Sequence, residues 1–65
     1  MLDQEIGKTV KNGFRRASVV RLWSSSSWEL VKEWFSFSRW IRETEQYQTL
    51  REAIEHRDNF LRGEA

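Results

Sequence analysis

The sequence predicts an α+β fold in which a three-stranded antiparallel β-meander packs against one C-terminal α-helix. Three features carry this prediction: an Asn-Gly pair suited to a tight turn, alternating aromatic and serine residues within 32–38, and helically spaced apolar residues near the C-terminus. The strands are expected at about residues 5–11, 14–23 and 28–38, and the helix at about residues 45–62. Because so small a sheet is not stable alone, the helix must cover its apolar face.

The length of 65 residues predicts one small domain, residues 1–65, near the lower size limit for independent folding. The chain has no Cys and one His, so we expect no disulfide, no metal site and no cofactor. No stretch approaches the roughly 20 apolar residues of a membrane span, and the N-terminus lacks the apolar core of a signal peptide. We therefore expect a cytoplasmic protein with no membrane partner.

Charge is unevenly distributed along the chain, although the net charge is only +1. Residues 1–42 hold eight basic and four acidic residues, a net +4, whereas residues 43–65 hold three basic and six acidic residues, a net −3. No acidic residue lies between Glu5 and Glu29, but five basic ones do. This asymmetry predicts a basic face and an acidic face on one small domain.

The first hairpin is predicted by Asn12-Gly13, because both residues tolerate the positive φ of a type I′ turn. Such a turn pairs Lys11 with Phe14. The alternative, a helix over residues 2–22, would contain two glycines and several β-branched residues, which are poor helix formers.

The serine run at residues 24–27 predicts the loop of a second hairpin, although Ser26 and Glu29 also fit the start of a helix. Aromatic-serine alternation in residues 32–38 favours a strand, because Ser is a mediocre helix former and β-strands prefer aromatic residues. Strand and helix remain the two alternatives for residues 27–42.

The register of the second hairpin decides which aromatic residues are buried. Direct pairing of Trp23 with Trp28 sends Phe35 to the face away from the helix, whereas a shift of one residue places Phe35 and Phe37 beneath the helix. We predict the shifted register, which leaves Trp34 on the open side of the sheet.

The C-terminal helix has recognisable ends. Thr49 and Glu52 form a capping box, and Thr44 is an alternative cap for an earlier start. Gly63 stands where a glycine commonly follows a helix. Within the apolar stripe, Arg57 is expected to extend to solvent or to pair with a carboxylate of the sheet such as Glu33.

Three segments follow one another in a familiar order: NGFRRASVV (12–20), KEWFSFS (32–38) and LREAIEHRDNFL (50–61). This order resembles the three-strand-plus-helix DNA-binding domains of the ethylene-response-factor (APETALA-type) class, which includes the N-terminal arm-binding domain of tyrosine integrases. The resemblance implies that the open sheet face enters the DNA major groove, where alternating Arg and Trp residues read bases. The chain departs from the class in three ways: it lacks a clear Gly-Val start, it has Arg15 in place of an aromatic residue, and its connection RWIRETEQ is long.

We therefore expect a sequence-reading module for double-stranded DNA, of phage or mobile-element type, acting in transcription regulation or recombination. A sheet face fits the major groove, with alternate side chains reaching phosphates and base edges. The candidate DNA-binding residues are Thr9, Lys11, Arg16, Ser18, Lys32, Trp34 and Ser36. The alternative is a small helical protein that oligomerises or binds a partner protein through exposed Trp residues.

Catalysis has little support in the sequence. There is no Cys, no glycine-rich phosphate loop and no Ser/His/Asp arrangement with a supporting context. His56 is surrounded in sequence by acidic residues and is expected on a solvated helix surface. We therefore predict that the protein is not an enzyme.

Overall fold

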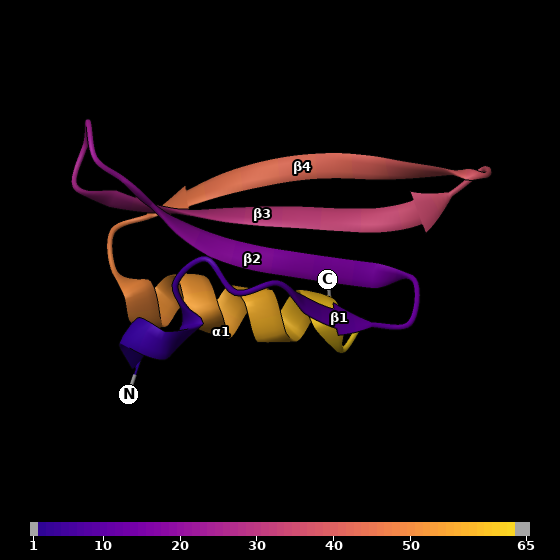
Figure 1. Cartoon of the computed structure of the whole chain (residues 1–65), viewed down its shortest axis with the longest axis horizontal. Helices are drawn as coiled ribbons and strands as arrows, with labels where there is room; N and C mark the ends of the chain where they lie inside the picture. Colours follow the sequence, from indigo (N-terminus) through magenta and orange to yellow (C-terminus); the bar gives the residue numbers. More distant parts are fainter. Residues whose placement is uncertain (1, 64–65) are drawn as a thin grey trace.

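The computed structural model describes residues 2–63 as one sheet with a single α-helix packed on one face (Figure 1). The elements, in chain order, are a 3-10 helix η1 (Leu2–Glu5), the strands β1 (Val10–Asn12), β2 (Arg15–Leu22), β3 (Ser27–Ser36) and β4 (Arg39–Tyr47), and the helix α1 (Leu50–Leu61). All neighbouring strands are antiparallel in the order β1-β2-β3-β4. The β1–β2 and β3–β4 turns lie at one end of the sheet, here called the turn end, where the β3–β4 turn projects furthest (Figure 1).

The predicted three-stranded fold class is wrong, because the arrangement is β-β-β-β-α. Residues 39–47 were expected to form a connection and the first turn of the helix, but they form β4, and α1 begins only at Leu50. Polar residues lie on both faces of β4, so its alternation gives no clear apolar stripe. Its turn, Phe37–Ser38, also lacks the Gly or Asn that marks a tight hairpin in a sequence.

The second and third predicted strands are confirmed by β2 and β3, and the helical alternative for residues 27–42 is wrong. Both helix-end signals are also confirmed. Thr49 is the N-cap of α1, where its Oγ1 accepts a hydrogen bond from the Glu52 backbone N–H at 3.2 Å and donates to the Glu52 carboxylate at 3.0 Å. Gly63 follows the last helical turn with φ +85°.

The core is small and lies between α1 and the centre of the sheet. Its buried members are Ala17, Val19 and Leu30 from the strands and Ala53 and Leu61 from the helix. Alanines on both sides let the helix backbone approach the sheet closely.

Two strand side chains hold the C-terminal end of α1. Asn12 Nδ2 donates a hydrogen bond to the Leu61 carbonyl at 2.7 Å, and Arg15 Nη1 donates to the Phe60 carbonyl at 2.7 Å. The last carbonyls of a helix have no partner within the helix, and a cation there complements the helix dipole. These bonds therefore fix the helix end over β1 and β2.

The predicted shifted register of the second hairpin is wrong. Leu22 pairs with Ser27, whereas direct pairing of Trp23 with Trp28 would place Leu22 opposite Glu29. The observed register therefore differs from direct pairing by two residues. A shift of two residues keeps every side chain on the face that direct pairing assigns.

Trp34 and Phe35 consequently lie on the faces opposite to those predicted. The Trp34 ring meets the Phe60 ring edge-on on the helix side, with 6.0 Å between ring centroids. Phe35 is on the other face and 42% exposed, while Phe37 is 94% exposed in the β3–β4 turn rather than beneath the helix.

The first hairpin turns one residue later than predicted. Asn12 pairs with Arg15, and Gly13 and Phe14 form the turn, with Gly13 at φ +63°. The buried Arg57 pairs with Glu5 at 3.4 Å and with Asp58 at 2.9 Å, rather than with a carboxylate of the sheet.

Replacing Phe37–Ser38 by Asn-Gly should raise the free energy of unfolding by about 1 to 2 kcal/mol, because ordinary residues are strained in the left-handed region. Phe37 and Ser38 both have positive φ, at 52° and 64°. Urea unfolding followed by Trp fluorescence measures the change. Ser25→Gly, in a loop position without positive φ, should give no such gain, and an unchanged or lower stability of the Asn-Gly variant would contradict the interpretation.

Candidate nucleic-acid interface

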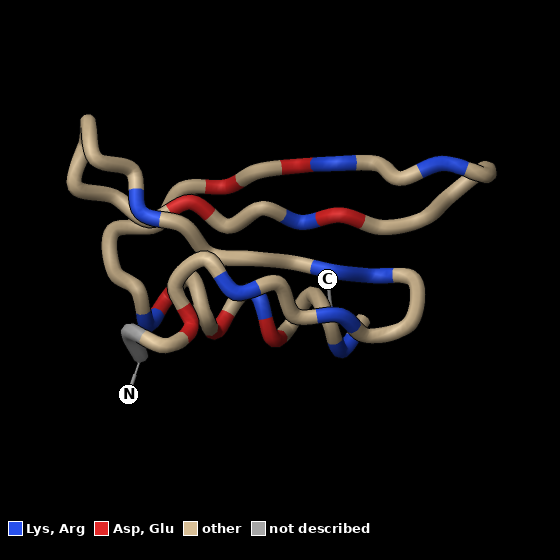
Figure 2. The backbone as a smooth tube through the Cα atoms, in the orientation of Figure 1, with Lys and Arg blue, Asp and Glu red and all other residues tan. Residues whose placement is uncertain are grey.

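The face of the sheet opposite α1, here called the open face, carries a row of charged side chains across all four strands. Strand pairing aligns the residues of this charged row: Lys11, Arg16, Glu33 and Arg42. Adjacent strands lie about 4.8 Å apart, so the row is roughly 14 Å wide. Basic residues concentrate in the half of the sheet near the turn end (Figure 2).

Glu33 holds the two arginines of the charged row. Arg16 Nε donates to Glu33 Oε1 at 2.9 Å, and Arg42 Nε donates to Glu33 Oε2 at 3.3 Å. The Arg16 hydrogen bond is the main cause that lowers the pKa of Glu33 below its usual 4.5, and Arg42 adds to it. One carboxylate thus orders two guanidinium groups and leaves the row with an excess of positive charge.

An aromatic group, defined as Phe14, Phe35 and Trp40, adjoins the charged row at the turn end. The ring centroids of Phe14 and Phe35 are 6.0 Å apart, and those of Phe35 and Trp40 are 5.6 Å apart. The Arg16 guanidinium lies 4.0 Å from the centroid of the Trp40 ring, in cation–π geometry. Arg16 therefore links the charged row to the aromatic group. Within this group, the side chain of Phe14 is 74% exposed to solvent.

The predicted DNA-binding residues are divided between the two faces of the sheet. Thr9 is exposed just before β1. Those on the open face are Lys11, Arg16 and Ser18. Those on the helix side, where the predicted placement is wrong, are Lys32, Trp34 and Ser36.

Sequence reasoning missed the contribution of β4 to the open face. The positions Trp40, Arg42, Thr44 and Gln46 alternate along this strand and share the open face with Phe35. This alternation was the available signal, but residues 39–47 were assigned to a connection and a helix.

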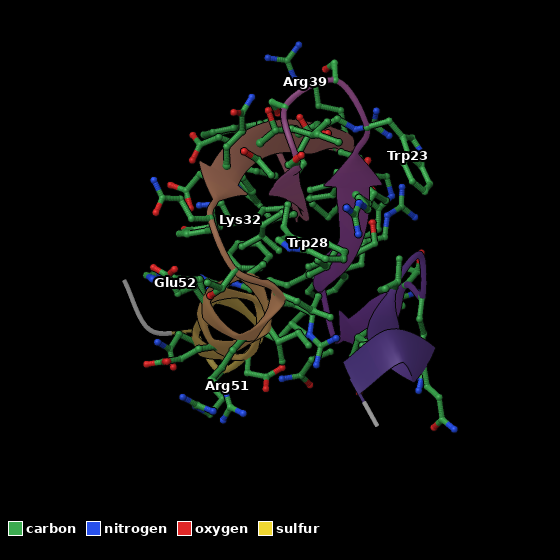
Figure 3. All side chains as sticks on the ribbon, turned by 90° about the vertical axis from the view of Figure 1, so that its left-hand side faces the viewer. Trp23, Trp28, Lys32, Arg39, Arg51 and Glu52 are labelled. Atoms are coloured by element: carbon green, nitrogen blue, oxygen red, sulfur yellow. The ribbon has the colours of Figure 1, made fainter. Side chains whose placement is uncertain are left out.

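The helix side has a cleft of about 550 Å³ between α1 and β4, into which Lys32 points (Figure 3). Lys32 Nζ lies 3.1 Å from Glu45 Oε1 and 3.3 Å from Glu43 Oε1. Tyr47 donates its hydroxyl proton to Glu45 at 2.6 Å, and burial, together with this bond, raises the pKa of Tyr47 to about 12. The His56 ring stacks on Tyr47 with 4.5 Å between centroids. Because these polar groups bind one another, the cleft is a weaker candidate than the open face.

The tryptophans differ in exposure. Trp23 is 85% exposed in the β2–β3 loop and points away from the sheet, whereas Trp28 lies between sheet and helix (Figure 3). Self-association through exposed Trp residues stays a prediction, and Trp23 is the residue available for it.

Within residues 2–63, no cluster of His, Cys, Asp and Glu is arranged to hold a metal ion. The helices of this described part are too short or too polar to cross a membrane. No protein-family model matches the chain, and comparisons with curated proteins and with solved structures found no significant match. The resemblance to ethylene-response-factor domains therefore depends on the three sequence segments alone.

Glu33→Gln should lower the free energy of unfolding at neutral pH. The pKa of Glu33 is lowered in the folded protein, which means that its ionised carboxylate stabilises the folded state. This stabilisation is complete above the unfolded-state value of 4.5 and is lost as pH falls through the lower folded-state pKa. Urea unfolding at neutral and acidic pH should show wild type and variant converging in acid. The control Glu43→Gln removes an exposed carboxylate whose ion pair contributes little to stability. A stability difference between wild type and Glu33→Gln that stays the same from neutral to acidic pH would contradict the role of Glu33.

Proposed function

We propose that the protein is a small nucleic-acid-binding module that uses the open face of its sheet. The observation that carries the proposal is the Arg16 guanidinium, which lies between the Trp40 ring and the Glu33 carboxylate and so joins ordered arginines to exposed aromatic rings. Arginine binds phosphate, and aromatic rings bind bases, so the two groups together suit both parts of a nucleotide.

The charge of the turn end supports this function. On the open face, in the half of the sheet nearest the two turns, one acidic residue, Glu33, accompanies three basic residues: Lys11, Arg16 and Arg42. At physiological salt, charges act over about 8 Å, so this local excess governs binding more than the overall charge does. The three acidic residues of α1, Glu52, Glu55 and Asp58, belong to a helix that packs on the other face of the sheet.

The resemblance to ethylene-response-factor domains supports the same class of function, since those domains also bind DNA with an open sheet face. The fourth strand departs from their architecture. A role in transcription regulation or recombination, in a phage or mobile element, is part of this proposal and implies an intracellular location.

Binding to a labelled DNA, measured by fluorescence anisotropy at low salt, tests the proposal. The affinity should fall steeply as salt rises, because each phosphate contact contributes a slope of about −0.7 to −0.9 in log affinity against log salt. A folded protein that binds no nucleic acid at micromolar concentration would overturn it.

Arg42→Gln should weaken binding about threefold to tenfold and reduce the salt slope by about one. Arg51→Gln is the matched control, because Arg51 lies on α1 and points away from the sheet (Figure 3). Both variants lose one positive charge. Equal losses of affinity would mean that net charge, rather than the open face, determines binding.

Glu33→Gln should strengthen binding, because it releases Arg16 and Arg42 from their ion pairs. The control Glu43→Gln removes the same charge from the helix side of the sheet. Anisotropy titrations should show a larger gain for Glu33→Gln. A gain that is the same for both, or a loss for Glu33→Gln alone, would contradict the placement of the site.

A further inference from the structure

Phe37 is the most exposed large hydrophobic residue in the described part of the chain, at 94%, and its backbone φ of 52° is unusual for an aromatic residue. Its ring contacts no other ring of residues 2–63. At the turn end, the turn that carries it projects further than the β1–β2 turn (Figure 1). Strained, exposed positions of this kind indicate a functional role, because neither packing nor turn geometry favours Phe here.

Phe37 lies in the β3–β4 turn, at the same end of the molecule as the aromatic group. It follows Phe35 by two residues, and Phe35 in turn contacts Phe14 and Trp40. Phe14, Phe35 and Phe37 together present apolar rings at one end of the molecule, beside the charged row. An occupant of this end must therefore combine negative charge with flat apolar groups.

A second copy of the chain does not meet this requirement. A symmetric dimer through the turn end would place the same surface on both sides of the interface. The charged row, with three basic residues and one acidic residue, would then oppose a surface of the same net positive charge, which is costly at an interface. The charge thus selects a polyanion over self-association.

Duplex DNA also fits poorly. Its bases stack on one another and present only their edges in the grooves, so they offer no ring faces to Phe37 or Phe14. The charged row is roughly 14 Å wide before side chains are added, against about 12 Å for the major groove. A single strand has free base faces and a flexible backbone that can follow the row.

We propose that the open face binds single-stranded nucleic acid, with bases stacked on Phe37, Phe35 and Phe14 and with phosphates along the charged row. This inference rests on the proposed function and deepens it by naming the class of ligand. No base-specific contact is required, so binding is expected to tolerate changes of sequence.

The test is anisotropy titration of a labelled strand of about 20 nucleotides and of the duplex formed with its complement, at ~50 mM salt. The single strand should bind at least about tenfold more tightly. Tighter or equal binding of the duplex would overturn this inference and leave the proposed function standing. Failure of both ligands to bind would overturn both.

Phe37→Ala should weaken binding of the single strand about fivefold or more, as expected for loss of one stacked base. Phe37→Tyr keeps the ring and should keep the affinity. Trp23→Ala is the matched control, because it removes another highly exposed ring, in the β2–β3 loop at the opposite end of the sheet. Phe37→Asn should weaken binding while raising the melting temperature, so that a loss of binding cannot be attributed to unfolding. Undiminished binding by Phe37→Ala and Phe37→Asn would overturn the stacking role.

Discussion

The structure depends on one constraint: a single 12-residue helix must stabilise a four-stranded sheet. The helix covers only one face, so its contact must be close and well fixed. Ala17 and Ala53 permit the close approach, and the bonds from Asn12 and Arg15 to the last helical carbonyls fix the helix end. The remaining face has no covering element and is stabilised by contacts among its own side chains. Ion pairs and ring contacts replace a second hydrophobic layer there.

The parts of the fold that were predictable are those with local signals. Thr49, Glu52 and Gly63 marked the helix ends by side-chain and backbone chemistry that acts within a few residues. β4 was not predictable in the same way, because it is an edge strand with polar residues on both faces. Its turn is formed by Phe37 and Ser38, whose positive φ is set by strand pairing rather than by preference.

The site was only partly predictable because it depends on register. The β2–β3 loop permits several pairings, and a change of one residue exchanges the faces of every side chain in β3. Lys11 and Arg16 were assigned correctly, since the first hairpin retains the expected face pairing. Lys32 and Trp34 were assigned to the wrong face. On the helix side, Lys32 Nζ lies 5.7 Å from the centroid of the Phe60 ring and pairs with two glutamates.

The exposed aromatic end lies beside an edge strand of the sheet. β4 is an unpaired edge, and edges of this kind invite association between molecules unless charges interrupt them. This edge carries four charged residues, Arg39, Arg42, Glu43 and Glu45, and charged side chains interrupt pairing of this kind. The same guanidinium groups can bind phosphate. The charges that interrupt this edge and the guanidinium groups that can bind phosphate therefore lie on the same strand, beside the exposed aromatic rings.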